Sequence, residues 1–147
     1  RDYYASRGLG DVYKRQHYIQ RYFDYYSSQI TGGFYMSQYH IYQLPVEAGY
    51  AFRGWNETKD RFSINDYNKV YSCELWDQVI IGGKAERCNT NDLEVLEDLF
   101  AFFNWIPPSD YTGRSISVSD VIEIVREEGS KYYYCDSLGW KEIEPGF

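Results

Sequence analysis

The residues best suited to chemistry gather around one polar segment, DYTGRSISVSD, in the last third of the chain. Arg114 carries a planar guanidinium with five donors, a shape that suits phosphate or carboxylate. Serine hydroxyls and backbone amides can add donors, and aromatic rings can stack on a base. The segment and the strands expected after it therefore predict a site for a small anionic, nucleotide-like ligand. Its expected members are Tyr111, Arg114, Ser115, Ser117, Ser119, Asp120, Tyr134, Asp136 and Trp140.

A structural role for the same residues is the alternative. Asp120 and Asp136 stand where turns are expected, and carboxylates at such positions commonly cap turns. Arg114 can bridge the two carboxylates. In that case the cluster holds a corner of the sheet and binds no ligand. The sequence leaves both interpretations open.

No set of residues typical of a catalytic centre stands out. Acyl transfer needs a nucleophile, a base and an orienting group, and the only histidines are His17 and His40. A triad of His40 with Ser117 and Asp120 can be written down, but nothing in the sequence supports it. The metal-ligand pattern H-x-x-x-H and a glycine-rich phosphate loop ending in Lys-Ser or Lys-Thr are both missing. We therefore predict that the protein is not an enzyme and uses no catalytic residue, metal or cofactor.

The charge balance bears on the class of partner. The 147 residues include 15 basic and 22 acidic side chains, a net charge of −7. A long nucleic acid is an unexpected partner, because gripping its phosphates needs clustered Lys and Arg. Acidity is compatible with a protein partner, with mimicry of nucleic-acid charge, or simply with a well-solvated surface.

Tyrosine dominates an aromatic content of 20%, with 17 Tyr, 8 Phe and 4 Trp. Tyrosine suits a half-buried sheet surface. It is also favoured at interfaces, where it offers area, rigidity and a hydroxyl. A Tyr-rich face can therefore be a sheet surface, a ligand wall or the interface of a homo-oligomer.

The cysteines and the hydropathy indicate a cytoplasmic protein. Cys73, Cys88 and Cys135 are odd in number and widely spaced, which favours reduced thiols over disulfides or zinc. We find no signal peptide and no apolar run long enough to cross a bilayer, and so expect no contact with a membrane.

Residues 1–16, RDYYASRGLGDVYKRQ, resemble the translated sequencing-adapter read-through found at the ends of metagenomic open reading frames. We expect this tail to be an artefact and exclude it from fold reasoning; a genuine N-terminal arm is the alternative. The tail holds four basic and two acidic residues. The remaining 131 residues therefore carry 11 basic and 20 acidic side chains, a net charge of −9.

Apolar periodicity and turn residues predict an α+β fold for residues 17–147, with two helices packed on one mainly antiparallel sheet in a single domain. The helices are expected at about 17–31 and 92–104. Asn91 and Glu94 form a capping box for the second helix, whose buried stripe is expected to include Leu93. Strands are expected over residues 34–44, 51–55, 70–75, 78–81, 84–88, 115–126, 131–136 and 140–143, with tight turns over 127–130 and 137–139.

Two motifs resemble the signature of the YodL-like domain family: TGRSISVSDVI and YYYCDSLGWKEI. Upstream, YHIYQL and the run from Tyr67 to Tyr71 also fit the pattern of this family. The resemblance covers about residue 39 to the C-terminus. It departs from the family in a longer link over residues 76–91 and in Trp140, where Phe is commoner. Such domains accompany phage, plasmid and conjugative-element genes of bacteria, so the resemblance implies a setting in a bacterial host cell and no known chemistry.

These observations together predict a non-catalytic binding protein of a phage or mobile element. We expect a counter-defence role, in which the protein sequesters a small nucleotide-type signal or blocks a host defence protein. One alternative is a protein-interaction accessory module of conjugative or phage machinery. A nucleotide-processing enzyme is the remaining alternative.

Overall fold

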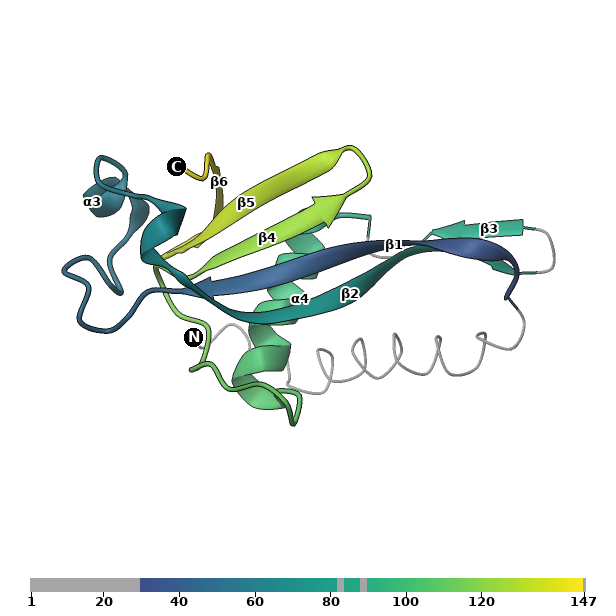
Figure 1. The fold of residues 1–147 in the computed structure, drawn as a ribbon, viewed down its shortest axis with the longest axis horizontal. Coiled ribbons are helices and arrows are strands. Elements are labelled where there is room, and N and C mark those ends of the chain that lie inside the picture. Colours follow the sequence, from purple (N-terminus) through teal and green to yellow (C-terminus); the bar gives the residue numbers. More distant parts are fainter. Residues whose placement is uncertain (1–29, 82–83, 88–89, 147) are drawn as a thin grey trace. The chain divides into compact units, whose positions relative to one another are not determined.

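The computed structural model describes residues 30–81, 84–87 and 90–146. Six strands follow the order β3-β2-β1-β4-β5-β6 in one sheet (Figure 1). The pairings whose register is described are all antiparallel. The predicted α+β fold with a mainly antiparallel sheet is thus confirmed. The strands are β1 (Ile30–Gln43), β2 (Asn68–Ile81), β3 (Lys84–Arg87), β4 (Val121–Arg126), β5 (Gly129–Asp136) and β6 (Gly139–Ile143).

The described helices are α3 (Trp55–Thr58), the 3-10 turn η2 (Ile64–Asp66) and α4 (Asp92–Trp105). None of them is long and apolar enough to cross a membrane. The predicted helix over 17–31 lies outside the described residues except at Ile30 and Thr31, which begin β1 instead. The predicted tail, residues 1–16, lies outside them as well.

The chain divides into two compact units, each described here by itself. One unit comprises Arg1–Met36 and Trp76–Ser109. The other comprises Ser37–Leu75 and Asp110–Phe147 and is called the motif unit, because it contains the polar segment. That residues 17–147 form a single domain stays a prediction.

Helix α4 begins as its sequence predicts. The side chain of Asn91 accepts a hydrogen bond from the Glu94 N–H at 3.2 Å, which satisfies a donor that the first helical turn leaves unpaired. The buried side is formed by Val95, Leu96, Leu99, Phe100, Ala101 and Phe103. Leu93 was wrongly predicted to be buried: it lies in the first turn, before the buried residues begin at Val95, and is 56% exposed.

The C-terminal meander is confirmed, with one correction at its start. Strands β4 and β5 join through a hairpin closed by Arg126 and Gly129, and β5 and β6 through one closed by Asp136 and Gly139. The predicted strand over 115–126 begins only at Val121. Residues 118 and 119 form a turn before it, in which Ser119 adopts a φ of 84°, outside the range of a regular strand.

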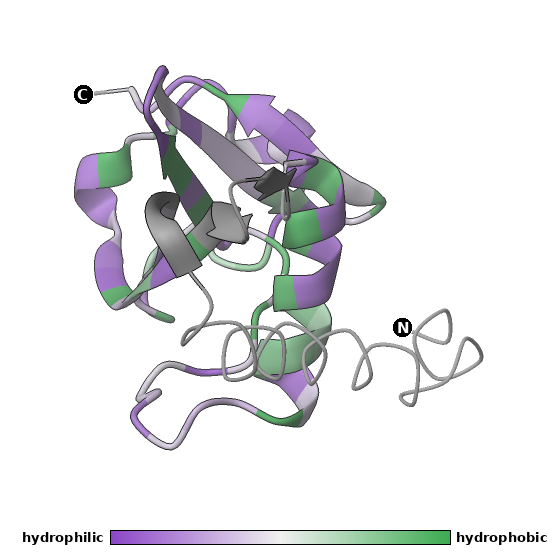
Figure 2. Ribbon diagram, turned by 90° about the vertical axis from the view of Figure 1, so that its right-hand side faces the viewer, coloured by the Kyte–Doolittle hydropathy of each residue, from purple (hydrophilic) through white to green (hydrophobic). Residues whose placement is uncertain are grey.

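Segment 45–67 completes the core of the motif unit. It carries no strand, so the predicted strand over 51–55 was wrong: Phe52 has a φ of 65°, and α3 begins at Trp55. The centre of the Trp55 ring lies 5.0 Å from the centre of the Tyr134 ring on β5. Figure 2 shows hydrophobic (green) and hydrophilic (purple) bands along the strands and along α4. The hydrophobic cluster that this segment helps to form contains Leu44, Tyr50, Ile64, Tyr67, Val121, Tyr134 and Ile143.

The turn between β5 and β6 depends on the glycine that closes it. Gly139 has a φ of 105°, and a Cβ added there would meet no atom within 4 Å. We expect Gly139→Ala to lower the free energy of unfolding by about 1–2 kcal/mol, through backbone strain alone. Gly49→Ala is the control, because its Cβ would lie 3.9 Å from the nearest atom, Nη1 of Arg61. Urea unfolding checks both, and equal changes would contradict the prediction.

Candidate functional site

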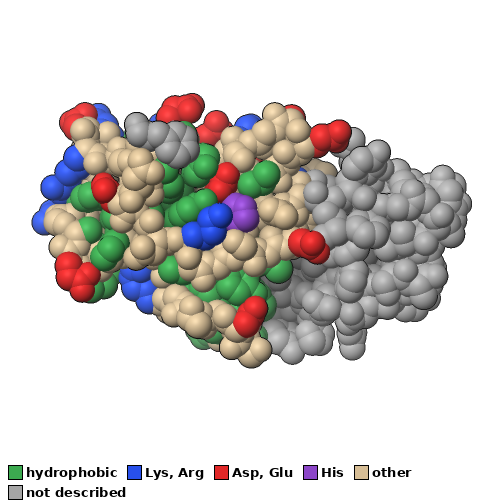
Figure 3. Space-filling view, in the orientation of Figure 1, with side chains coloured by type: hydrophobic (Ala, Val, Ile, Leu, Met, Phe, Trp, Pro, Cys, Tyr) green, Lys and Arg blue, Asp and Glu red, His purple; other side chains and the backbone are tan. Residues whose placement is uncertain are grey.

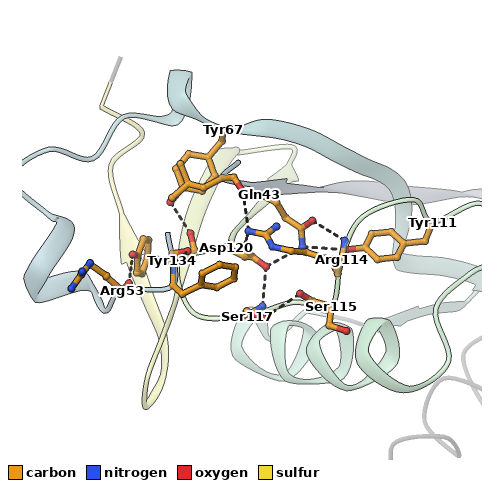
Figure 4. Close-up of polar contacts among 12 residues, drawn as sticks. Gln43, Arg53, Tyr67, Tyr111, Arg114, Ser115, Ser117, Asp120 and Tyr134 are labelled. Carbon is orange, nitrogen blue, oxygen red and sulfur yellow. Dashed lines mark hydrogen bonds and ion pairs between the residues drawn. The ribbon is translucent and has the colours of Figure 1, made fainter. Parts of the chain in front are cut away.

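Asp120 is the centre of the polar segment and is fully buried. Its Oδ2 accepts hydrogen bonds from the Ser117 N–H at 2.8 Å and from Gln43 Nε2 at 3.0 Å. Its Oδ1 lies 3.3 Å from Nη2 of Arg114. Figure 4 shows these side chains converging on the carboxylate. We call Gln43, Arg114, Ser117 and Asp120 the Asp120 network, in which both carboxylate oxygens are occupied.

Gln43, the last residue of β1, ties the loop before the turn to the sheet. Its Nε2 donates to the carbonyl oxygen of Arg114 at 2.9 Å, and its Oε1 accepts from the Arg114 N–H at 3.1 Å. Gln43 is only 3% exposed. Sequence reasoning missed this residue, although it stands in the YHIYQL stretch. The only available signal was a polar residue at the end of an otherwise aromatic and apolar strand.

Gly113 lets the loop approach these groups closely. The Tyr111 hydroxyl donates to the Arg114 carbonyl at 2.5 Å. A Cβ on Gly113 would lie 2.6 Å from Tyr111 Oη and 2.9 Å from Gln43 Oε1, and no real Cβ tolerates such contacts. A residue with a side chain would therefore force Tyr111 and Gln43 out of their places.

Ser119 fastens the turn to β5. Its N–H donates to the Cys135 carbonyl at 2.9 Å, and the Cys135 N–H donates to the Asp120 carbonyl at 2.8 Å. Two consecutive residues, Ser119 and Asp120, thus pair with the single residue Cys135, as in a β-bulge. Bulges often orient side chains next to functional sites. The Ser119 carbonyl also accepts from the Tyr67 hydroxyl at 2.6 Å. The positive φ of Ser119 is therefore fixed by several hydrogen bonds.

An exposed aromatic ring sits on this buried framework. Phe52 is 49% exposed, and its N–H donates to Ser119 Oγ at 2.9 Å. The guanidinium carbon of Arg114 lies 5.0 Å from the centre of the Phe52 ring, which is within the range of a cation–π interaction. The Arg114 side chain is 28% exposed. We call these two residues the Phe52–Arg114 pair.

The remaining predicted residues lie on β5 and β6 or at the surface. The Tyr134 hydroxyl accepts from Thr58 Oγ1 at 3.0 Å and donates to the Arg53 carbonyl at 2.5 Å. Asp136 Oδ1 accepts from the N–H groups of Trp55 and Ser137, so Asp136 caps the start of α3 and a turn. Ser115 is exposed, and Trp140 is partly buried.

The structure therefore joins Tyr111, Arg114, Ser117 and Asp120 directly. Ser119, Asp120 and Tyr134 are completely buried. Their hydrogen bonds hold turns and strands together, as expected if the cluster forms a corner of the sheet. That the nine predicted residues bind a ligand stays a prediction. Among these nine residues, Arg114 is the one that carries a positive charge and is also partly exposed. The Nδ1 atom of His40, which would be the base of a triad with Ser117 and Asp120, lies 2.7 Å from Ser72 Oγ.

The comparisons with known proteins can be set beside this geometry. The model of the YodL-like domain family matches residues 38–147, which is more than half of the chain. The chain belongs to the YodL-like domain family. Neither the curated proteins nor the solved structures contain a match. The YodL-like domain includes the whole Asp120 network and Phe52.

Burial raises the pKa of Asp120 in this YodL-like domain to about 7, against the opposing effects of the Ser117 N–H, the Arg114 charge and Gln43. The folded protein then binds a proton that the unfolded chain releases near pH 4. The contribution of this carboxyl to stability is therefore fully present below about pH 4 and is lost as the pH rises toward 7.

Asp120→Asn removes this titration. Between pH 4 and 7, we expect the free energy of unfolding of the natural protein to fall relative to that of the variant, by at most about 1.4 kcal/mol per pH unit. Urea unfolding of both proteins across this range measures the difference. Parallel pH profiles would show that Asp120 does not titrate as its burial requires.

Proposed function

We propose that this YodL-like protein is a non-catalytic binding protein of a phage or mobile element, acting in the bacterial cytoplasm against host defence. The observation that supports this most is the Phe52–Arg114 pair. The Phe52 side chain is about half exposed, and the backbone of Phe52 has a φ of 65°. Its ring lies beside the partly exposed guanidinium of Arg114. Non-glycine residues in this conformation cost about 1–3 kcal/mol and cluster at binding sites.

Recognition of a protein fits this geometry well. Aromatic and arginine side chains dominate the binding energy of protein interfaces. Figure 3 shows Lys and Arg side chains together with Asp and Glu side chains toward α3 on the face that it draws, and Arg53, Lys59 and Arg61 in segment 45–67 are exposed. A carboxylate beside an apolar recess on the partner would complement both Arg114 and the Phe52 ring. We propose a host defence protein with such a surface as the target.

A small nucleotide signal fits the same place less well. Pockets for small molecules enclose most of their ligand, whereas Ser119, Asp120 and Tyr134 are buried beneath the surface and cannot line a pocket without rearrangement. The Asp120 carboxylate also lies next to Arg114, which opposes a bound phosphate. Nucleotide sequestration and an accessory role in the machinery of the element itself are therefore alternative outcomes of the experiment.

Phe52→Asn tests the proposed site with little risk to the fold. Asparagine tolerates positive φ better than phenylalanine does, so we expect unchanged or higher thermal stability. In bacteria carrying defence systems, the full chain should restore phage plating and Phe52→Asn should not. Leu138→Asn, at a residue that is 98% exposed on the β5–β6 turn, is the matched control and should behave like the natural protein.

A photo-crosslinking phenylalanine analogue at position 52 identifies the partner. The purified partner should bind the natural chain about 10- to 100-fold more tightly than Phe52→Asn, as for a typical interface hot spot. Full plating with Phe52→Asn would contradict the site. Crosslinking to a protein of the element would favour the accessory role. Calorimetric binding of a nucleotide, lost in Arg114→Ala, would favour sequestration.

A further inference from the structure

Among the residues that the structure describes, strand β6 ends the order of the sheet, so one of its edges has no neighbouring strand there (Figure 1). From this geometry we infer that the free edge of β6 binds an extended segment of another protein as an added strand. The chain after β6 turns toward η2, where the Ile64 N–H donates to the Pro145 carbonyl at 2.9 Å. The exposed edge is therefore limited to the residues of β6, Gly139–Ile143.

The backbone groups at this edge can be assigned from the neighbouring strand. Both backbone groups of Cys135 point away from β6, since its N–H donates to Asp120 and its C=O accepts from Ser119. Cys135 faces Trp140 in the register of β5 and β6, so this pair exchanges no hydrogen bonds. Hydrogen-bonded and non-hydrogen-bonded pairs alternate along an antiparallel ladder. Lys141 thus bonds to β5, and Trp140 and Glu142 direct their peptide groups outward.

Trp140 and Glu142 therefore present two N–H groups and two C=O groups along the free edge of β6. Unpaired edge groups of this kind are a template for an incoming strand. The side chains set the chemistry of that strand. Glu142 and Lys141 are exposed, and Trp140 is partly so. A complementary segment carries an apolar residue beside Trp140, a basic residue by Glu142 and an acidic residue by Lys141.

A second copy of this chain suits the edge poorly. Pairing the outward groups of Trp140 with those of Glu142 from another copy would set two Lys141 side chains directly opposite each other. Pairing Glu142 with Glu142 would oppose two carboxylates. Like charges directly opposite on neighbouring strands are destabilising. In both registers that use the outward groups of Glu142, the charges of β6 therefore favour a different protein as the source of the added strand.

Selection of linear nine-residue peptides from a phage-displayed library on the full chain tests the inference. We expect selected peptides to carry an apolar, an acidic and a basic residue at consecutive positions, opposite Trp140, Lys141 and Glu142, and to slow hydrogen exchange at the Trp140 and Glu142 amides, measured by NMR. Glu142→Pro removes one outward N–H and should weaken binding at least tenfold. Glu142→Ala keeps that N–H, and its affinity should fall much less.

Several results would overturn the inference. They are failure to select any such peptide, binding that leaves the exchange of both amides unchanged, and equal affinity of Glu142→Pro and the natural chain. Dimerisation through β6, seen by analytical ultracentrifugation and abolished by Glu142→Pro, would assign the edge to a second copy instead. Because the exchange measurement uses the natural chain, it remains decisive if the proline variant does not fold. Phe52→Asn should bind the peptides normally, which separates this edge from the proposed function.

Discussion

The carboxylate of Asp120 has no contact with water, so protein groups must supply the hydrogen bonds that water would otherwise give. An unpaired buried charge would cost far more than the marginal stability of a domain allows. The Ser117 N–H, the Gln43 amide and the Arg114 guanidinium meet this demand. Each of these contacts also fixes a piece of backbone: the turn before β4, the end of β1 and the loop through Gly113.

The hydrogen bonds of the buried Asp120 also fix the positions of Arg114 and Phe52 at the surface. Arg114 is held from below by Asp120 and by the Leu44 carbonyl, which leaves its guanidinium facing the Phe52 ring. Ser119, the neighbour of Asp120 in the turn, accepts the Phe52 N–H. An exposed aromatic residue is thereby kept at a positive φ by buried groups. The proposed recognition point and the structural corner are therefore parts of one arrangement.

Sequence reasoning succeeded where the determining interactions are local. The cap of α4 spans three residues, and the turns of the β4–β5–β6 meander are set by glycines next to them. It failed over residues 115–120, where Ile116 and Val118 alternate with serines as in a strand. There the Asp120 side chain bonds the Ser117 N–H, and such local bonds compete with strand ladders.

Two members of the site, Gln43 and Phe52, were beyond sequence reasoning because their contacts are distant in the chain. Gln43 meets Arg114 across 71 positions, and Phe52 meets Ser119 across 67. No periodicity or spacing reports such pairs. An exposed Phe in an irregular segment and a Gln at a strand end are both ordinary features of sequences, and only the fold gives them a common partner.

Amide hydrogen exchange in Asp120→Asn tests most directly whether the buried carboxylate organises the site. The account predicts that the Ser117 and Phe52 amides exchange at least tenfold faster in the variant than in the natural protein. Amides within α4, which lies in the other unit, should keep their protection. If the Ser117 and Phe52 amides stay as protected as in the natural protein, Asp120 does not hold the turn, and the link from the buried network to the Phe52–Arg114 pair is wrong.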